Sequence, residues 1–185
     1  MVERGIELRT ASGCGLAIGR YPRFSYDASG GGGSCAATPV EQDGRLALAF
    51  APDSLHIPPM DRHSTRCLGL PLPPGLSIAI HPEQLGGWLQ PQSGTVALRL
   101  DARFRFRVGR LYTAPDLLIS TTLTTGESRG ALLAATGLPL GPSGAGLLVG
   151  VAVVQPSGDG WLDRFLGLPT EALALLRCRF IRLPC

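Results

Sequence analysis

The amino-acid sequence predicts a mainly β domain, an antiparallel sandwich or open barrel of roughly seven to nine strands with one short helix near residues 159–168. Apolar and polar residues alternate over the long stretch 95–108, and the 25 glycines and 16 prolines fall between short apolar runs, as expected for many turns. Helical spacing is clear in only one segment. A length of 185 residues favours a single domain over 1–185. The alternative is an α+β fold with a curved antiparallel sheet wrapped around a helix.

The first elements in the chain are two short apolar stretches at 5–10 and 14–19, which predict one or two edge strands. They precede four consecutive glycines at 30–33. Since glycine has the greatest backbone freedom and no side chain to pack, we expect a flexible loop over about 28–37.

Two further strands are predicted at 44–51 and 75–81, each directly after a turn signal, Asp43-Gly44 and Pro73-Pro74-Gly75. The residues between them, 52–74, are interrupted by prolines. This segment is therefore expected at an edge of the sheet or on the surface.

The longest predicted strand is 95–108, and residues 116–125 are expected to return antiparallel to it as a hairpin. Alternation places one set of apolar side chains on its inner face: Val96, Leu98, Leu100, Ala102, Phe104, Phe106 and Val108. The outer face carries Arg99, Arg103, Arg105 and Arg107.

The last elements are a strand at 147–155, a helix and a C-terminal strand. The strand is apolar on both faces, which predicts a central position or a helix as cover. The helix within 158–169 is expected to begin at a cap, Asp159, to end at Gly167 and Pro169, and to supply that cover. The final strand has Leu176, Cys178 and Phe180 on one face and Arg177 and Arg179 on the other.

All 17 basic residues are arginine, and the chain has neither lysine nor asparagine. The codons of both missing residues are AT-rich, so this composition indicates a GC-rich, bacterial genome. It excludes phosphate-loop, Schiff-base and general-base lysines, as well as N-glycosylation. The net charge of +3 is low for a dedicated nucleic-acid-binding protein, and no nucleic acid is expected as a partner.

Five cysteines without a C-x-x-C pair indicate reduced thiols in a cytoplasmic protein rather than a disulfide framework. The first ten residues lack the apolar region of a signal peptide, and no run of about 18 apolar residues predicts a transmembrane segment. Peripheral contact with a membrane stays open.

A serine nucleophile is the one catalytic hypothesis that the motifs raise. Residues 126–130, Gly-Glu-Ser-Arg-Gly, match the nucleophile-elbow pattern with Ser128 at its centre. In that fold the histidine follows the serine, whereas all three histidines here precede it. The order His63, Asp101 or Asp116, then Ser128 is formally possible, but it lacks the surrounding glycine motif. We expect a plain turn and no catalytic residue.

No metal or cofactor is expected. Potential ligands gather between residues 53 and 67, but their spacing matches no closed zinc pattern: Asp53, His56, Asp61, His63 and Cys67. The glycines at 31 and 33 resemble a dinucleotide fingerprint only formally, because no helix-forming sequence follows them.

The arginine row is the feature with the clearest physical content. Residues 99–110 contain five arginines and one acid, and the expected partner strand offers Ser120, Thr122 and Thr124 outward. Carboxylates from adjacent strands would make the row a solvated face, whereas their shortage predicts an anion site. We expect at least two of the first four arginines to lack a carboxylate. The candidate anion-binding residues are Arg99, Arg103, Arg105, Arg107, Arg177 and Arg179.

These observations lead to three functional hypotheses. The first is a non-catalytic binding module for an amphipathic anionic, lipid-like small molecule. The second is an interaction or scaffold module that docks an acidic protein through the arginine face, and the remote third is a serine hydrolase using Ser128. An apolar cavity of several hundred Å³ inside the sheet would favour the first hypothesis over the second.

Overall fold

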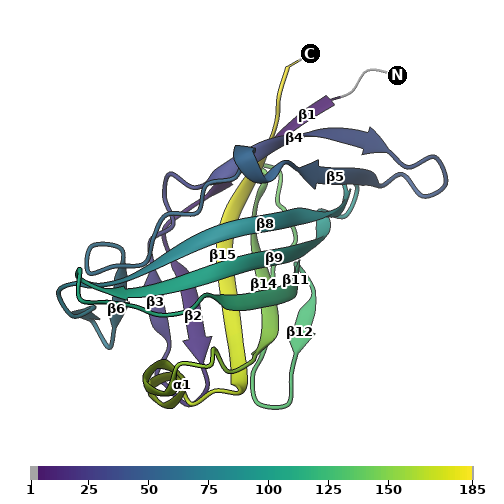
Figure 1. The fold of residues 1–185 in the computed structure, drawn as a ribbon. Helices are drawn as coiled ribbons and strands as arrows, with labels where there is room; N and C mark the ends of the chain where they lie inside the picture. Colours follow the sequence, from purple (N-terminus) through teal and green to yellow (C-terminus); the bar gives the residue numbers. More distant parts are fainter. Residues whose placement is uncertain (1–3, 185) are drawn as a thin grey trace.

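The largest sheet of the protein is antiparallel and closes on itself as a barrel (Figure 1). The computed structural model describes residues 4–184. Eight strands form the ring, in the order β1 (Arg4–Thr10), β4 (Gly32–Pro39), β5 (Leu46–Phe50), β8 (Leu76–Gln90), β9 (Thr95–Val108), β11 (Leu117–Thr124), β14 (Ala145–Val154) and β15 (Thr170–Arg182). Pairing of β15 with β1 completes the ring. The predicted mainly β antiparallel fold with one short helix is confirmed.

The smaller elements extend or cover this barrel. From β15, four short strands continue the sheet: β2 (Cys14–Ile18), β3 (Phe24–Tyr26), β6 (Thr65–Cys67) and β7 (Leu70–Pro71). The remaining elements are η1 (Pro52–Ser54), β10 (Tyr112–Thr113), which pairs with β9, the hairpin of β12 (Glu127–Arg129) and β13 (Ala134–Thr136), and α1 (Gly160–Leu166).

Strand β9 has the predicted alternation and supplies much of the core. Val96 and Leu98 are fully buried, whereas Leu100 and Phe104 are partly buried. The strand pairs with β8 along its whole length, apart from a bulge between Pro82 and Gln84. Its other neighbour is β11, in the antiparallel arrangement that the sequence predicts.

Helix α1 also matches the prediction at both ends. The side chain of Asp159 accepts a hydrogen bond from the Leu162 amide at 2.9 Å, and Gly167 ends the helix in the left-handed conformation with φ of 71°. The helix lies at one end of the barrel (Figure 1) and is not wrapped by the sheet. Leu162 and Leu166 pack there against the barrel core.

The outer face of β14 has a different cover from the predicted helix. The β12–β13 hairpin lies over it, and the Val151 amide donates to Ser128 Oγ at 3.0 Å. Glu171 on β15 holds the turn of this hairpin, because its carboxylate accepts the amides of residues 131–133. This hairpin covers part of the apolar outer face of β14, whereas Val153 remains 60% exposed.

The expectation of a loop over 28–37 is wrong from residue 32 onward, where β4 begins and pairs with both β1 and β5. The glycines are needed here for close backbone approach. A Cβ at Gly32 would collide with the Leu8 carbonyl oxygen, and one at Gly33 would lie 2.8 Å from the Ser54 carbonyl oxygen. A side chain is therefore excluded by the neighbouring backbone.

Two different segments lie beside β8 on the side away from β9. Strand β5 pairs only with Leu85–Leu89 of β8. Farther along, residues 55–60 take its place, bonded to β4 through Gly32 and His56 and to β8 through Met60 and Ile78. We call residues 55–60 the wall segment. No helix within residues 4–184 is both long and apolar enough to cross a membrane.

Candidate functional site: an apolar cavity inside the barrel

A cavity of about 110 Å³ lies inside the barrel, behind the wall segment. Strands from opposite sides of the ring line it, together with Leu55, Ile57 and Met60 of the wall segment. Its apolar lining includes Leu16, Ile80, Leu98, Leu100, Phe104 and Leu148. The cavity therefore offers dispersion contacts and excludes water from whatever occupies it.

Three polar side chains at the cavity are occupied by other parts of the protein. Thr10 Oγ1 donates to the Ala28 carbonyl at 2.6 Å, and the Tyr26 hydroxyl donates to the carbonyl of Pro58 in the wall segment. Cys14 Sγ donates to the Ala11 carbonyl at 3.2 Å. A molecule inside the cavity would meet mainly carbon.

Burial also keeps two groups at the cavity uncharged. Desolvation raises the pKa of the Cys14 thiol and the pKa of the Tyr26 hydroxyl above their usual values. Both groups are therefore protonated and neutral at pH 7. The cavity suits an uncharged ligand, or the uncharged part of a larger one.

The arginine row is mostly paired, contrary to our expectation. Arg99 Nε lies 3.3 Å from Asp101, Arg103 pairs with Glu83, and Arg105 binds Asp116 through two contacts of 2.7 and 3.0 Å. Among the described residues, only Arg107 of this row has no carboxylate within 4 Å. The expectation that at least two would be unpaired is wrong.

The carboxylates come from positions outside the regular strand-to-strand register. Asp101 is on β9 itself, Glu83 sits in the β8 bulge, and Asp116 directly precedes β11. In the sequence we counted Asp101 and the outward residues of the partner strand, but neither Glu83 nor Asp116. The β8 bulge has no clear signature in the sequence.

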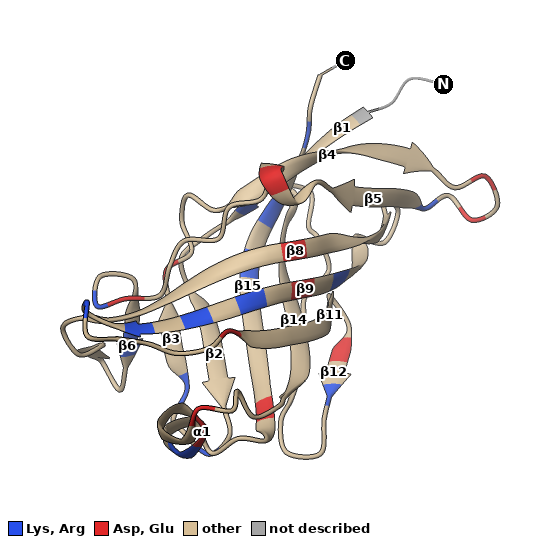
Figure 2. Cartoon of the chain, viewed as in Figure 1, with Lys and Arg blue, Asp and Glu red and all other residues tan. Residues whose placement is uncertain are grey.

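The row faces solvent on the outside of the barrel, because the alternation that points Leu98, Leu100 and Phe104 into the cavity points the arginines away from it. Figure 2 shows the positive charges along β9 beside the negative ones on β8 and β9.

Arg177 and Arg179 are exposed on β15, but β11 and β14 separate that strand from β9. Arg177 Nε donates to the Gly13 carbonyl at 3.2 Å. The six candidate arginines thus belong to two separate surfaces and do not form one site.

The Ser128 hydroxyl makes a structural hydrogen bond and is not arranged as a catalytic nucleophile. Its hydroxyl oxygen accepts the Val151 amide within a two-stranded hairpin, and no histidine of the described chain is hydrogen-bonded to it. Asp101 binds Arg99 and Ser120, and Asp116 binds Arg105. Neither aspartate orients a histidine.

The stretch between residues 53 and 67 forms no metal-binding group. Across residues 4–184, no three His, Cys, Asp or Glu side chains come together as metal ligands would. Asp61 Oδ1 instead accepts the amides of His63 at 2.8 Å and Ser64 at 3.1 Å. The described cysteines are free thiols: Cys14, Cys35, Cys67 and Cys178. Cys185 lies outside the described residues.

Comparison of the chain with protein-family models, with curated proteins and with solved structures found no match. The site is therefore interpreted from its own geometry. Sequence reasoning identified the inward residues of β9 but not the cavity, which depends on strands distant in the chain and on the unpredicted position of the wall segment.

Proposed function

We propose that this protein is a non-catalytic binding module that holds a small apolar molecule, or the apolar part of an amphipathic one, inside its barrel. The cavity is the observation that carries this proposal. An empty volume of that size in a core costs about 2–3 kcal/mol of folding stability, at roughly 24 cal/mol per Å³. A ligand that fills it recovers part of this cost as binding energy.

The size of the cavity limits the ligand. At about 110 Å³ it is somewhat smaller than an engineered cavity of roughly 150 Å³ that binds benzene, and much smaller than drug-sized pockets of roughly 300–1,000 Å³. It is also smaller than the volume that our first hypothesis required. It suits a single ring or the end of an alkyl or isoprenoid chain.

Access to the cavity is proposed through the wall segment. Two backbone bonds hold it to β4 at His56 and two hold it to β8 at Met60, whereas the β8–β9 ladder runs over fourteen paired positions. Displacing the wall segment therefore requires fewer bonds to break than separating β8 from β9. A longer ligand would enter by this route.

The arginine row gives little support to an anionic group on the ligand or to the docking of an acidic protein. Its outward orientation separates it from a ligand inside the barrel. Three of its four guanidinium groups already have carboxylate partners, which weakens the case for docking an acidic protein there. An anionic head group would have to be bound at the surface by other residues.

The test compares two alanine-to-leucine variants. Ala174→Leu places extra carbon in the cavity, whereas Ala49→Leu adds the same group to an exposed position on β5. Thermal unfolding is measured with and without benzene, and with and without decanoate. We expect benzene or decanoate to raise the Tm of the wild type and of Ala49→Leu, but not that of Ala174→Leu.

Two outcomes contradict the proposal. One is that neither probe changes the wild-type Tm and native mass spectrometry shows no co-purifying small molecule. The other is an equal rise in Tm for Ala174→Leu and the wild type, because the ligand would then be bound outside the cavity.

A further inference from the structure

Four aromatic side chains lie in contact on α1 and beside it, and three of them are exposed. Trp161 stacks on Phe165 with ring centroids 5.1 Å apart, Tyr112 contacts Trp161 edge-on at 5.3 Å, and Tyr21 lies 6.1 Å from Phe165. We call these four residues the aromatic cluster. Trp161 is 52% exposed, and Phe165 and Tyr21 are each 41% exposed. Large aromatic rings held in contact with solvent indicate a surface that another partner covers.

The aliphatic neighbours of the aromatic cluster are exposed as well. Leu111, in the turn next to Tyr112, is 96% exposed, and Leu132 beside Phe165 is 52% exposed. These side chains stand on separate projections of the fold, namely α1, the β9–β10 turn and the tip of the β12–β13 hairpin. They do not form one flat surface.

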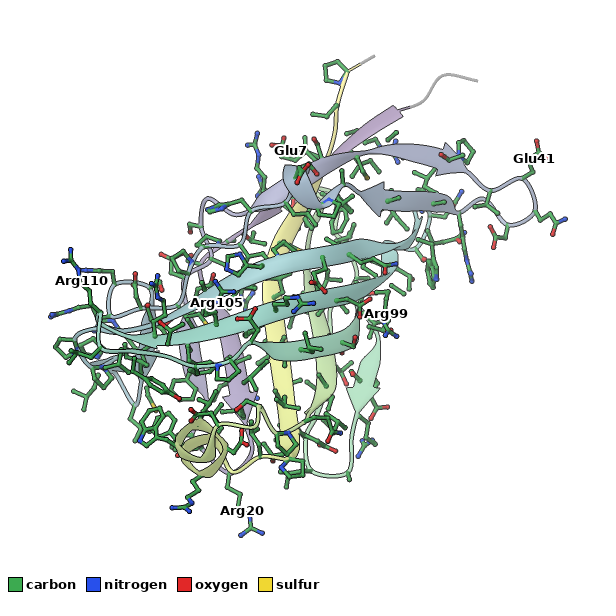
Figure 3. All side chains as sticks on the ribbon, in the orientation of Figure 1. Glu7, Arg20, Glu41, Arg99, Arg105 and Arg110 are labelled. Atoms are coloured by element: carbon green, nitrogen blue, oxygen red, sulfur yellow. The ribbon has the colours of Figure 1, made fainter. Side chains whose placement is uncertain are left out.

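Positive charge accompanies these apolar side chains. Arg20 and Arg164 line the depression between Tyr21 and Phe165, and Arg110 precedes Leu111. None of the three has a carboxylate within 4 Å in the described part of the chain, unlike most of the arginine row. Figure 3 shows Arg20 and Arg110 extended into solvent.

The two carboxylates at the start of α1 and within it are engaged by backbone amides. Asp159 accepts from the Leu162 amide, and Asp163 accepts from the amides of Ser157 and Gly158. They stabilise the start of α1 and do not bind Arg164. The guanidinium groups are thus left for anions from outside the protein.

We propose that the aromatic cluster docks onto the surface of a bilayer containing anionic phospholipids, with Arg20 and Arg164 bound to headgroup phosphates. Tryptophan and tyrosine favour the interface between hydrocarbon and water, and guanidinium matches phosphate in charge and geometry. Anionic lipids attract arginines close to the surface. This inference does not depend on what the cavity holds.

A bilayer fits the arrangement better than a second protein does. The core of a protein interface is a continuous, closely packed surface. Here separate apolar projections alternate with unpaired arginines. A fluid interface can receive each projection individually while the arginines stay at the level of the phosphates.

The test is co-sedimentation of the full chain with phosphatidylcholine vesicles, with and without phosphatidylglycerol. Arg20→Gln plus Arg164→Gln removes two charges from the proposed surface. Arg103→Gln plus Arg105→Gln removes two charges from the arginine row and serves as the matched control. We expect the first pair to weaken binding to anionic vesicles about tenfold or more, and the control to bind within about twofold of the wild type.

Added salt should weaken wild-type binding, and neutral vesicles should bind far less. Inorganic phosphate should not compete at concentrations comparable to the lipid phosphate, because it lacks the apolar contact. In a Trp88→Phe background, Trp161 fluorescence should shift to shorter wavelength when anionic vesicles are added. This measurement needs no change within the aromatic cluster.

The proposal is wrong if the wild type does not bind anionic vesicles, or if both arginine pairs reduce binding equally. A dimer in light scattering that Trp161→Ala abolishes, without vesicle binding by the wild type, would assign the surface to self-association. Competition by inorganic phosphate at equal concentration would show that the site binds the free ion rather than a bilayer.

Discussion

Leu98 is the residue on which both the core and the cavity depend. It is fully buried on β9 and contributes to the cavity lining. We predict that Leu98→Ala lowers the free energy of unfolding by about 2–5 kcal/mol, since it removes buried carbon and enlarges an existing void. Urea unfolding measures the change. Leu118→Ala, at a 62% exposed position on β11, should stay within about 0.5 kcal/mol of the wild type.

The ion pair between Arg105 and Asp116 predicts a specific pH dependence. The hydrogen bond from Arg105 lowers the pKa of Asp116, so the carboxylate stabilises the fold above its unfolded pKa of about 3.9. This contribution is lost as the pH falls through the lowered folded value. In Arg105→Gln, the loss of Tm between neutral pH and pH near 3 should therefore be smaller.

Arg107→Gln is the matched control for this measurement, because Arg107 has no carboxylate within 4 Å in the described residues. Its pH profile should overlay that of the wild type. Identical profiles for both variants and the wild type would mean that the Arg105 pair is too well solvated to matter for stability.

Single residues also show where sequence reasoning reached its limit. The inward positions of β9 could be predicted, because a period of two assigns every side chain to one face. The partners of Arg103 and Arg105 could not, because Glu83 depends on a bulge and Asp116 on the start of the next strand. Which side chains meet across neighbouring strands depends on the strand register and on the bulges that interrupt it.

Strand β4 provides the prediction at the level of elements. Gly32 has φ of +133° and lies against the Leu8 carbonyl oxygen, whereas a Cβ at Gly160 meets nothing within 4 Å. Gly32→Ala should therefore destabilise the protein by more than about 1 kcal/mol, and Gly160→Ala should leave it unchanged or stabilise it by up to about 1 kcal/mol. Equal effects in urea unfolding would contradict the close approach of β1 and β4.

The elements most accurately predicted were those with strong local signals. Helix α1 has a cap and a stop residue in its own sequence, and β9 and β11 have uninterrupted alternation. The glycine stretch was misjudged because freedom in an isolated chain and close packing in a sheet call for the same residue. Only the presence of a neighbouring strand shows whether a glycine stretch is a flexible loop or a closely packed strand.

For the molecule as a whole, the pairing of β1 with β15 decides between a closed and an open sheet. Closure pairs β1 with β15, so the amides of Glu7, Arg9 and Ile181, which face this seam, should exchange with solvent as slowly as those in the middle of β9. The wall segment should exchange faster than either, since few bonds hold it. Hydrogen-exchange mass spectrometry tests both expectations, and rapid exchange along β1 would show that the barrel opens there.

The closure has a last consequence for how the backbone is connected. The Leu183 amide donates to the Gly5 carbonyl at 2.9 Å, and β1 begins and β15 ends at the same side of the barrel (Figure 1). A short glycine-serine linker could join these two ends, and new ends could be made in the exposed β4–β5 turn between Glu41 and Gln42. This circular permutation would begin the chain at β5 and end it at β4 without altering the order of strands around the ring. We therefore expect the fold to depend on that cyclic order rather than on where the polypeptide begins.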